Sequence, residues 1–212
     1  MTLLRRAYRR LHFAVLACLL AGLFPGLPSA SAETPMQALE TTSQKAIVLL
    51  TDTELLKPEN AVQRRKALIS VVGERFSCDE MAKRSLGDEW VKLNSIEQQE
   101  FVRLFQALLA KSYAAKIEAY AGQPIQYLGQ QIGNGYATVS AKVYAVKNEF
   151  LLDFHLLYKD GEWLVYDVVV DGVSQINSYR GQFARVLRFA SYEELIERMR
   201  EKAEFPIHAR AD

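Results

Sequence analysis

The stretch Trp163–Phe183, WLVYDVVVDGVSQINSYRGQF, decides the fold of this chain. Its first half is apolar at almost every position, with Asp167 as the exception, and such a run is typical of a β-strand covered on both faces. Its second half has the apolar spacing of an amphipathic helix. We therefore predict a buried strand that runs through Asp171 and Gly172 directly into a helix.

Turn signals divide the preceding segment, residues 124–171, into four antiparallel strands. Gly133-Asn134-Gly135 separates the first two strands, Asn148 the second and third, and Asp160-Gly161 the last two. Asp-Gly is a preferred two-residue hairpin turn. Alternate residues of a strand point to opposite faces, so the second strand has one small apolar face. That face consists of Ala137, Val139, Ala141, Val143 and Ala145.

The segments on either side of the strands have helical spacing. We expect a helix from Pro35 to about Leu56, and a second helix that starts at Pro58, since proline suits the first turn. A short helix, Asp79–Leu86, should follow. After the strands we expect helices over Val173–Ala190 and from Ser191 to about Glu204. The predicted class is α+β, a curved four-stranded antiparallel sheet with helices packed on one face and an apolar pocket between them.

The longest predicted helix begins at a capping box of Ser95 and Gln98 and ends before Gly122. Its apolar positions cover an arc of roughly 220° at 100° per residue, more than one sheet can cover. Such a helix either sits centrally or lines a cavity, and we expect its wide arc to face the Ala137–Ala145 side of the sheet. Large side chains opposite small ones either fill a core or leave a cavity for a long apolar ligand.

The N-terminus has the three parts of a secretory signal peptide. Four arginines between positions 5 and 10 form a basic start, Leu11–Phe24 is apolar but short for a membrane span, and Ala30-Ser31-Ala32 offers a cleavage site. We expect removal of residues 1–32, which leaves residues 33–212 as a single domain in the periplasm. An uncleaved anchor is the alternative.

Charge and cysteine content exclude several classes of protein. The chain has 26 basic and 25 acidic residues, and the loss of four arginines with residues 1–32 leaves 22 against 25, a net charge of −3. A nucleic-acid-binding domain needs a dense basic patch, which the sequence lacks. Cys78 is the one cysteine left after cleavage, so neither an intramolecular disulfide nor a cysteine-based metal site is expected.

One group of residues has the composition of an acid–base site. Asp153 and His155 are two positions apart on a strand and therefore point to the same side, with Asp167 on the next strand. A carboxylate that orients a histidine is an ordinary device of general acid–base catalysis. The alternative is that both residues face water on the outer side of the sheet. The sequence contains no phosphate loop, dinucleotide fingerprint or nucleophile elbow.

A further set of residues, spread over the chain, has a characteristic order and spacing. It comprises Phe76, Met81, Ala82, Leu86, Gly87, Trp90, residues 98–105 and Tyr113, then Tyr166-Asp167-Val168, Asp171-Gly172-Val173-Ser174, Tyr179-Arg180 and Gln182-Phe183. In these residues the chain resembles the MlaC, or toluene-tolerance, family over nearly all of residues 36–200. It departs at Ser77-Cys78-Asp79, where the family usually has Asp directly after the aromatic residue, and at Asp171, where Glu is frequent.

The resemblance implies a soluble periplasmic carrier that is not an enzyme and needs no cofactor or metal. Its cargo would be phospholipid, exchanged between an inner-membrane ABC lipid transporter complex and an outer-membrane lipoprotein–porin complex. The alternatives are an enzyme based on His155 and Asp153, a hopanoid-associated accessory protein, and an accessory or structural protein with a filled core. From side-chain direction we predict that the pocket wall contains Phe101, Phe105, Leu108, Tyr113, Val139, Val143, Phe154 and Val168. We interpret as structural supports Asp167, Gly172, Ser174, Tyr179 and Arg180.

Overall fold

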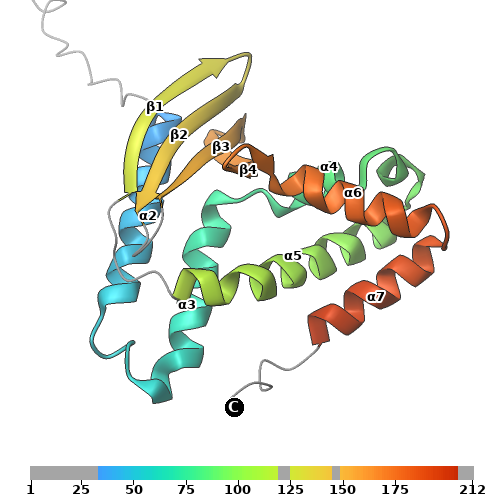
Figure 1. Cartoon of the computed structure of the whole chain (residues 1–212), viewed down its shortest axis with the longest axis horizontal. Coiled ribbons are helices and arrows are strands. Elements are labelled where there is room, and N and C mark those ends of the chain that lie inside the picture. Colours follow the sequence, from blue (N-terminus) through green and yellow to red (C-terminus); the bar gives the residue numbers. More distant parts are fainter. Residues whose placement is uncertain (1–32, 119–124, 145–148, 205–212) are drawn as a thin grey trace, which may run out of the picture. The chain divides into compact units, whose positions relative to one another are not determined.

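The structure is a computed structural model and describes residues 33–118, 125–144 and 149–204, with backbone alone for 114–118 and 204. Helices and strands follow one another as three groups (Figure 1). The N-terminal helical group consists of α2 (Pro35–Thr51), η1 (Pro58–Asn60), α3 (Ala61–Arg75), α4 (Cys78–Leu86), η2 (Gly87–Lys92) and α5 (Ser95–Glu118). The strands are β1 (Ile125–Gly133), β2 (Tyr136–Tyr144), β3 (Glu149–Lys159), β4 (Glu162–Val170) and β5 (Val173–Ser174). The chain then forms α6 (Gln175–Leu187) and α7 (Tyr192–Glu204).

The first helix begins as its sequence predicts but ends earlier. Thr34 and Gln37 form a reciprocal capping box, with Pro35 in the first turn. The helix was expected to reach about Leu56, which is wrong, because it ends at Thr51. The carboxylate of Asp52 accepts the backbone N–H groups of Glu54 and Leu55, and this local turn competes with further helix.

The start of α5 also differs in its chemistry from the expected capping box. The side-chain oxygen of Asn94 accepts the N–H groups of Ile96 and Glu97, and Glu97 in turn accepts the N–H of Asn94. The predicted pair of Ser95 and Gln98 is therefore wrong by one residue. The Gln98 amide instead donates to backbone carbonyls of the preceding turn.

The sheet is an antiparallel meander with the strand order β1-β2-β3-β4-β5. Each described hairpin turns on a two-residue Xaa-Gly pair with positive φ, at Asn134-Gly135, Asp160-Gly161 and Asp171-Gly172. The third turn corrects our expectation that β4 continues directly into a helix. The chain reverses at Asp171-Gly172, and Val173 and Ser174 pair back onto β4 as a fifth strand. Asp-Gly is a type I′ hairpin signal, which overrides the apolar continuity around it.

Two irregularities bend the sheet. The register shifts between Tyr127 and Gly129 in β1 and between His155 and Leu156 opposite β4. An extra residue in one strand increases the local twist and bends that strand. Figure 1 accordingly shows a strongly curved sheet, with α2 lying across it behind β1 and β2.

Two hydrophobic clusters stabilise the domain. The sheet cluster joins α2 to strands β2, β3 and β4, and the helical cluster joins α4, α5, α6 and α7. Phe76 packs against both clusters, and its backbone forms a parallel bridge with Val165 of β4. The short segment between α3 and α4 therefore connects the helical cluster to the sheet.

The position of α5 corrects a second expectation. Its large side chains were expected to face the small residues of β2, but Phe101, Leu104 and Phe105 are buried in the helical cluster. The broad apolar arc of α5 is explained by the three helices packed around it, α4, α6 and α7. The side of β2 with Ala137 is instead covered by α2.

Candidate functional site

The side of the sheet that faces α2, called the inner face below, is completely covered at one end. Val139, Ala141 and Leu156 are inaccessible to solvent there, as is Val165 of β4. Ala38 and Leu39 of α2 pack onto this region and complete it. This end of the inner face is an ordinary filled core.

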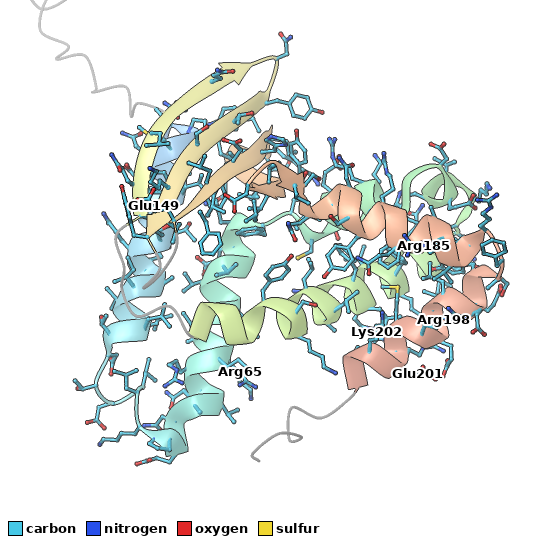
Figure 2. The ribbon with its side chains drawn as sticks, viewed as in Figure 1. Arg65, Glu149, Arg185, Arg198, Glu201 and Lys202 are labelled. Carbon is cyan, nitrogen blue, oxygen red and sulfur yellow. The ribbon has the colours of Figure 1, made fainter. Side chains whose placement is uncertain are left out.

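The same face is only partly covered at its other end. Strand pairing places six apolar residues there on the same side as Val139 and Ala141, and all six are half-buried. We call this group the open end, and it consists of Val143, Phe150, Leu152, Phe154, Val168 and Val170. Glu149, labelled in Figure 2, marks this end of β3 and forms an ion pair with Lys142 on the opposite face.

The C-terminal half of α5 reaches the strand-to-helix junction beyond β4. The Tyr113 hydroxyl donates to the side-chain oxygen of Gln175, the first residue of α6, at 2.6 Å. One position earlier on α5, the Ser112 hydroxyl accepts from the Tyr179 hydroxyl at 3.4 Å. Burial, followed by the nearby Tyr179 and Asp167, raises the pKa of Tyr113, so its hydroxyl stays protonated and can donate.

The structure does not bring all eight predicted wall residues together. Phe101 and Phe105 are fully buried in the helical cluster, stacked at 6.1 Å between ring centroids, and Leu108 packs on its edge. Val139 is buried under α2. Three of the eight lie in the open end, namely Val143, Phe154 and Val168. Tyr113 lies at the junction with α6.

Three residues of the open end are absent from that predicted set. Phe150 and Leu152 pair with Val143 and Ala141, and Val170 pairs with Leu152. The signal that could have found them is the alternation of β3 itself, since these residues share one face with Phe154. The register between strands, which decides which alternating set faces α2, comes only from the structure.

Three of the five predicted supports lie at the junction between β4 and α6, and the other two lie further along α6. The buried Asp167 carboxylate accepts the hydroxyl of Ser174 at 2.5 Å and the N–H of Ile176 at 3.0 Å. Ser174 also caps α6 by accepting the N–H of Asn177. Two further supports fix the helix, because Arg180 donates to the backbone oxygen of Arg84 at 2.9 Å and the Tyr179 ring packs on Phe105. The last support, Gly172, adopts φ +80° in the preceding turn.

The possible acid–base residues lie on the outer face and have other partners. Asp153 accepts the Ser140 hydroxyl at 2.5 Å, and the carboxylate of Asp167 is taken by Ser174 and Ile176. The His155 ring lies 6.0 Å from that of Tyr166. Within the described ranges, no hydrogen bond joins His155 to either carboxylate. The orienting contact that a histidine base needs is therefore missing from this arrangement.

A separate groove has the wrong chemistry for acyl chains. It has a volume of about 390 Å³ and lies between the end of α3, the start of α4 and the β3–β4 turn. Burial, with a smaller effect of Asp79, raises the pKa of the Cys78 thiol in this groove. Most of its other lining residues are charged or polar, among them Glu74, Ser77, Asp79, Gln106, Lys159, Asp160 and Glu162.

The described part of the chain holds neither a candidate metal site nor a helix that could span a membrane. Among these residues, no three His, Cys, Asp or Glu side chains are grouped so that they could hold a metal ion. No helix in the described ranges is long enough and apolar enough to cross a bilayer.

Comparison with known proteins identifies relatives of this chain. The sequence model of one protein family, described as "MlaC protein", matches residues 40–201. The "Intermembrane phospholipid transport system binding protein MlaC" of Haemophilus influenzae is 27% identical over 128 residues. This match covers 58% of the chain, and the chain spans about 60% of the length of that curated relative.

A solved structure shares the fold. The phospholipid-binding protein from Ralstonia solanacearum, determined in complex with a phospholipid, superposes with a TM-score of 0.71. The match covers 82% of this chain and 97% of the other, at 19% sequence identity. At that identity the likeness establishes the fold, an α+β arrangement with an open antiparallel sheet.

Proposed function

This chain belongs to the MlaC family, and from that premise we propose that it is a phospholipid carrier whose acyl-chain site includes the open end of the inner face. The observation that carries the proposal is the group of six apolar side chains that remain half-buried beside a filled core. The phospholipid bound to the Ralstonia protein of the same fold supports it.

The energetics of carrying a lipid fit such a surface. Each buried CH₂ group contributes about 0.8 kcal/mol, so two acyl chains with ~30 carbons together would cost more than ~20 kcal/mol to expose to water. A carrier must therefore cover both chains with apolar side chains. The open end offers such side chains already arranged on a rigid sheet, and covering them removes their own exposed apolar area from water.

The eight wall residues predicted from sequence then fall into two roles. We assign direct lipid contact to Val143, Phe154 and Val168 in the open end, with Leu108 and Tyr113 on the α5 side. Phe101, Phe105 and Val139 lie one layer deeper and hold the contacting surfaces in place. Two observations motivate this division, the exposure of each side chain and the strand register.

The place of the carrier in the cell is part of the same proposal. The carrier would receive or deliver its lipid in the periplasm, after removal of residues 1–32. Its partners would be an inner-membrane ABC lipid transporter and an outer-membrane lipoprotein–porin complex. The basic and apolar N-terminus supports export, and the name of the Haemophilus relative supports a role in lipid transport between membranes.

Two neighbouring leucines of β3 provide the test. Leu152 belongs to the open end, whereas Leu151 points to the outer face and is 53% exposed. Native mass spectrometry of the purified chain should show co-purifying phospholipid. The Leu152→Asp variant should lose most of this lipid, because a carboxylate in the acyl-chain site is strongly unfavourable.

The matched control is Leu151→Asp, which adds the same charge to the same strand and should keep its lipid. Circular dichroism and thermal unfolding would establish that both variants fold. Equal lipid content in the two variants would refute the open end as the acyl-chain site. A wild-type protein that carries no lipid from cells and accepts none from vesicles would refute the carrier itself.

A further inference from the structure

The outer surface of α6 carries a local excess of positive charge. Between Asp171 and Glu193 the chain has no acidic residue, yet it contains Arg180, Arg185 and Arg188. The chain from residue 33 onward has a net charge of −3, so the charge of this run is opposite in sign to the net charge of the chain. Over distances longer than a Debye length of about 8 Å, the remaining charges are screened, and a partner meets the local charge.

Helical geometry gathers these arginines on the exposed side. At 100° per residue, Arg185 and Arg188 lie roughly 60° apart. Gly181 and Ala184 fall on the same exposed side, and a Cβ added at Gly181 would meet no atom within 4 Å beyond the backbone of α6 itself. We call this surface the basic face of α6, and it consists of Arg180, Gly181, Ala184, Arg185 and Arg188. The residues between its arginines are small, so the face is open to a flat partner.

The positions of the arginines are restricted without being neutralised. Arg180 donates to the backbone oxygen of Arg84, which holds it at the edge of the face next to α4. The Arg188 guanidinium lies 5.5 Å from the ring centroid of Phe189. Among the described residues, neither Arg185 nor Arg188 forms an ion pair with a carboxylate. Figure 2 shows Arg185 on α6, far across the domain from Arg65 of α3.

An exposed aromatic ring completes the surface. Phe189 follows the end of α6 and is 82% exposed, more than any other large apolar residue described. A basic helix face with an adjacent aromatic side chain is the arrangement that lies on anionic bilayers, with the arginines at the phosphates and the ring among the glycerol and upper acyl groups. Phe189 is not among the lining residues of the groove described above, and the hot spots of protein partners occupy pockets.

We propose that the basic face of α6, with Phe189 at its end, docks this protein on the anionic surface of a membrane. The recognised chemistry is a layer of lipid phosphates bearing net negative charge. This contact is separate from the acyl-chain site on the inner face of the sheet. It would hold the protein at the bilayer surface while lipid enters or leaves that site.

Vesicle flotation tests the proposal on the chain from residue 33 onward. The vesicles contain either phosphatidylcholine alone or phosphatidylcholine with phosphatidylglycerol at about 30 mol%, which is about one anionic lipid in three. Wild-type protein should float with the anionic vesicles and remain behind with the neutral ones, and binding should weaken as salt rises. Each basic residue at such a surface is worth a factor of about five in affinity, so Arg185→Glu with Arg188→Glu should reduce binding at least about twenty-fold.

The matched control is Lys66→Glu with Arg103→Glu, which makes the same change in net charge at two exposed positions on α3 and α5. This variant should retain binding to within about twofold, because only local charge acts at the surface. Native mass spectrometry should find unchanged lipid cargo in both double variants, which separates docking from the proposed carrier function. The proposal is overturned if wild-type protein binds neutral and anionic vesicles equally, or if the control loses as much binding as the α6 variant. It is also overturned if the Arg185→Glu, Arg188→Glu variant still binds anionic vesicles but no longer binds an acidic protein.

Discussion

The hydroxyl of Tyr113 on α5 donates a 2.6 Å hydrogen bond to the side-chain oxygen of Gln175, the first residue of α6. Gln175 also donates from its amide nitrogen to the backbone oxygen of Val173, so its side chain is held at both ends. Through this contact, the C-terminal half of α5 is fixed to the turn that follows β4. The open end lies on the same strand, at Val168 and Val170.

Replacing Tyr113 with phenylalanine should loosen this contact and speed lipid exchange. Loss of one hydrogen bond lowers the free energy of unfolding by only about 1 kcal/mol, so the protein remains folded. We expect transfer of a fluorescent phospholipid to acceptor vesicles to become several times faster. Tyr192→Phe is the control, because it removes the hydroxyl that donates to the backbone oxygen of Glu97 at the other end of α5. A similar acceleration in both variants would show that general destabilisation, and not this contact, governs exchange.

Truncating Phe105 should lower the stability of the protein more than it lowers the lipid content. Its ring is fully buried and lies 5.2 Å from Tyr179 and 6.1 Å from Phe183, measured between ring centroids. Phe105→Ala should therefore lower the free energy of unfolding by about 3–5 kcal/mol. Urea denaturation measures this change. Phe189→Ala removes an equally large but exposed side chain and should change stability by less than about 0.5 kcal/mol. Equal effects of the two substitutions would contradict the assignment of Phe105 to the helical cluster.

Two glycines should respond in opposite directions to alanine. Gly172 has φ +80° in the turn after β4, and alanine there costs roughly 1–2 kcal/mol because its Cβ approaches the following carbonyl oxygen. Gly181 lies within α6 with open space around it. Alanine there should raise the free energy of unfolding by about 0.5–1 kcal/mol, because it restricts the unfolded chain. Thermal unfolding of both variants should shift to lower temperature for the first and higher for the second. A destabilised Gly181→Ala variant would be inconsistent with the open helical position of that residue.

Alkaline solution should destabilise the contact between α5 and α7. Burial, followed by the nearby Glu97 and Glu100, raises the pKa of Tyr192 to about 12 from the usual value of 10. A tyrosine whose pKa is raised by folding stabilises the native state fully below pH 10, and this contribution is lost as pH rises toward 12. We expect the urea midpoint of wild-type protein to fall over this window. Tyr192→Phe should begin lower at neutral pH and decline less steeply. Parallel curves for the two proteins would argue against Tyr192 as the titrating group.

Patterns that act locally along the chain predicted much of this fold. Period-two alternation identified the strands, and Asp160-Gly161 predicted its hairpin correctly because a type I′ turn depends on two adjacent residues. The family resemblance is confirmed by the match over residues 40–201. The α+β class with an open antiparallel sheet is confirmed as well, with five strands in place of four.

The errors concern choices between competing local signals and contacts distant in sequence. Asn94 and Ser95 are both good caps, and only the geometry of the chain shows that Asn94 is used. The width of the apolar arc on α5 was read correctly, but periodicity does not say which elements cover it. The burial of Phe101 and Phe105 among α4, α6 and α7 depends on residues more than 70 positions away, such as Phe183. Which predicted residues touch lipid is the question that the Leu152 and Leu151 variants address.

The order of elements along the chain has a consequence for how this protein is made. The meander can assemble from neighbouring hairpins, because each strand pairs with the next one. Its cover, α2, is synthesised before any strand, so the surface that buries Ala38 and Leu39 is complete only when Val165 has emerged. For that whole interval the earliest helix exposes an apolar face, which makes the nascent chain vulnerable to aggregation and a natural client for a holding chaperone. Formation of β4 ends this period, because it completes the surface on which α2 rests.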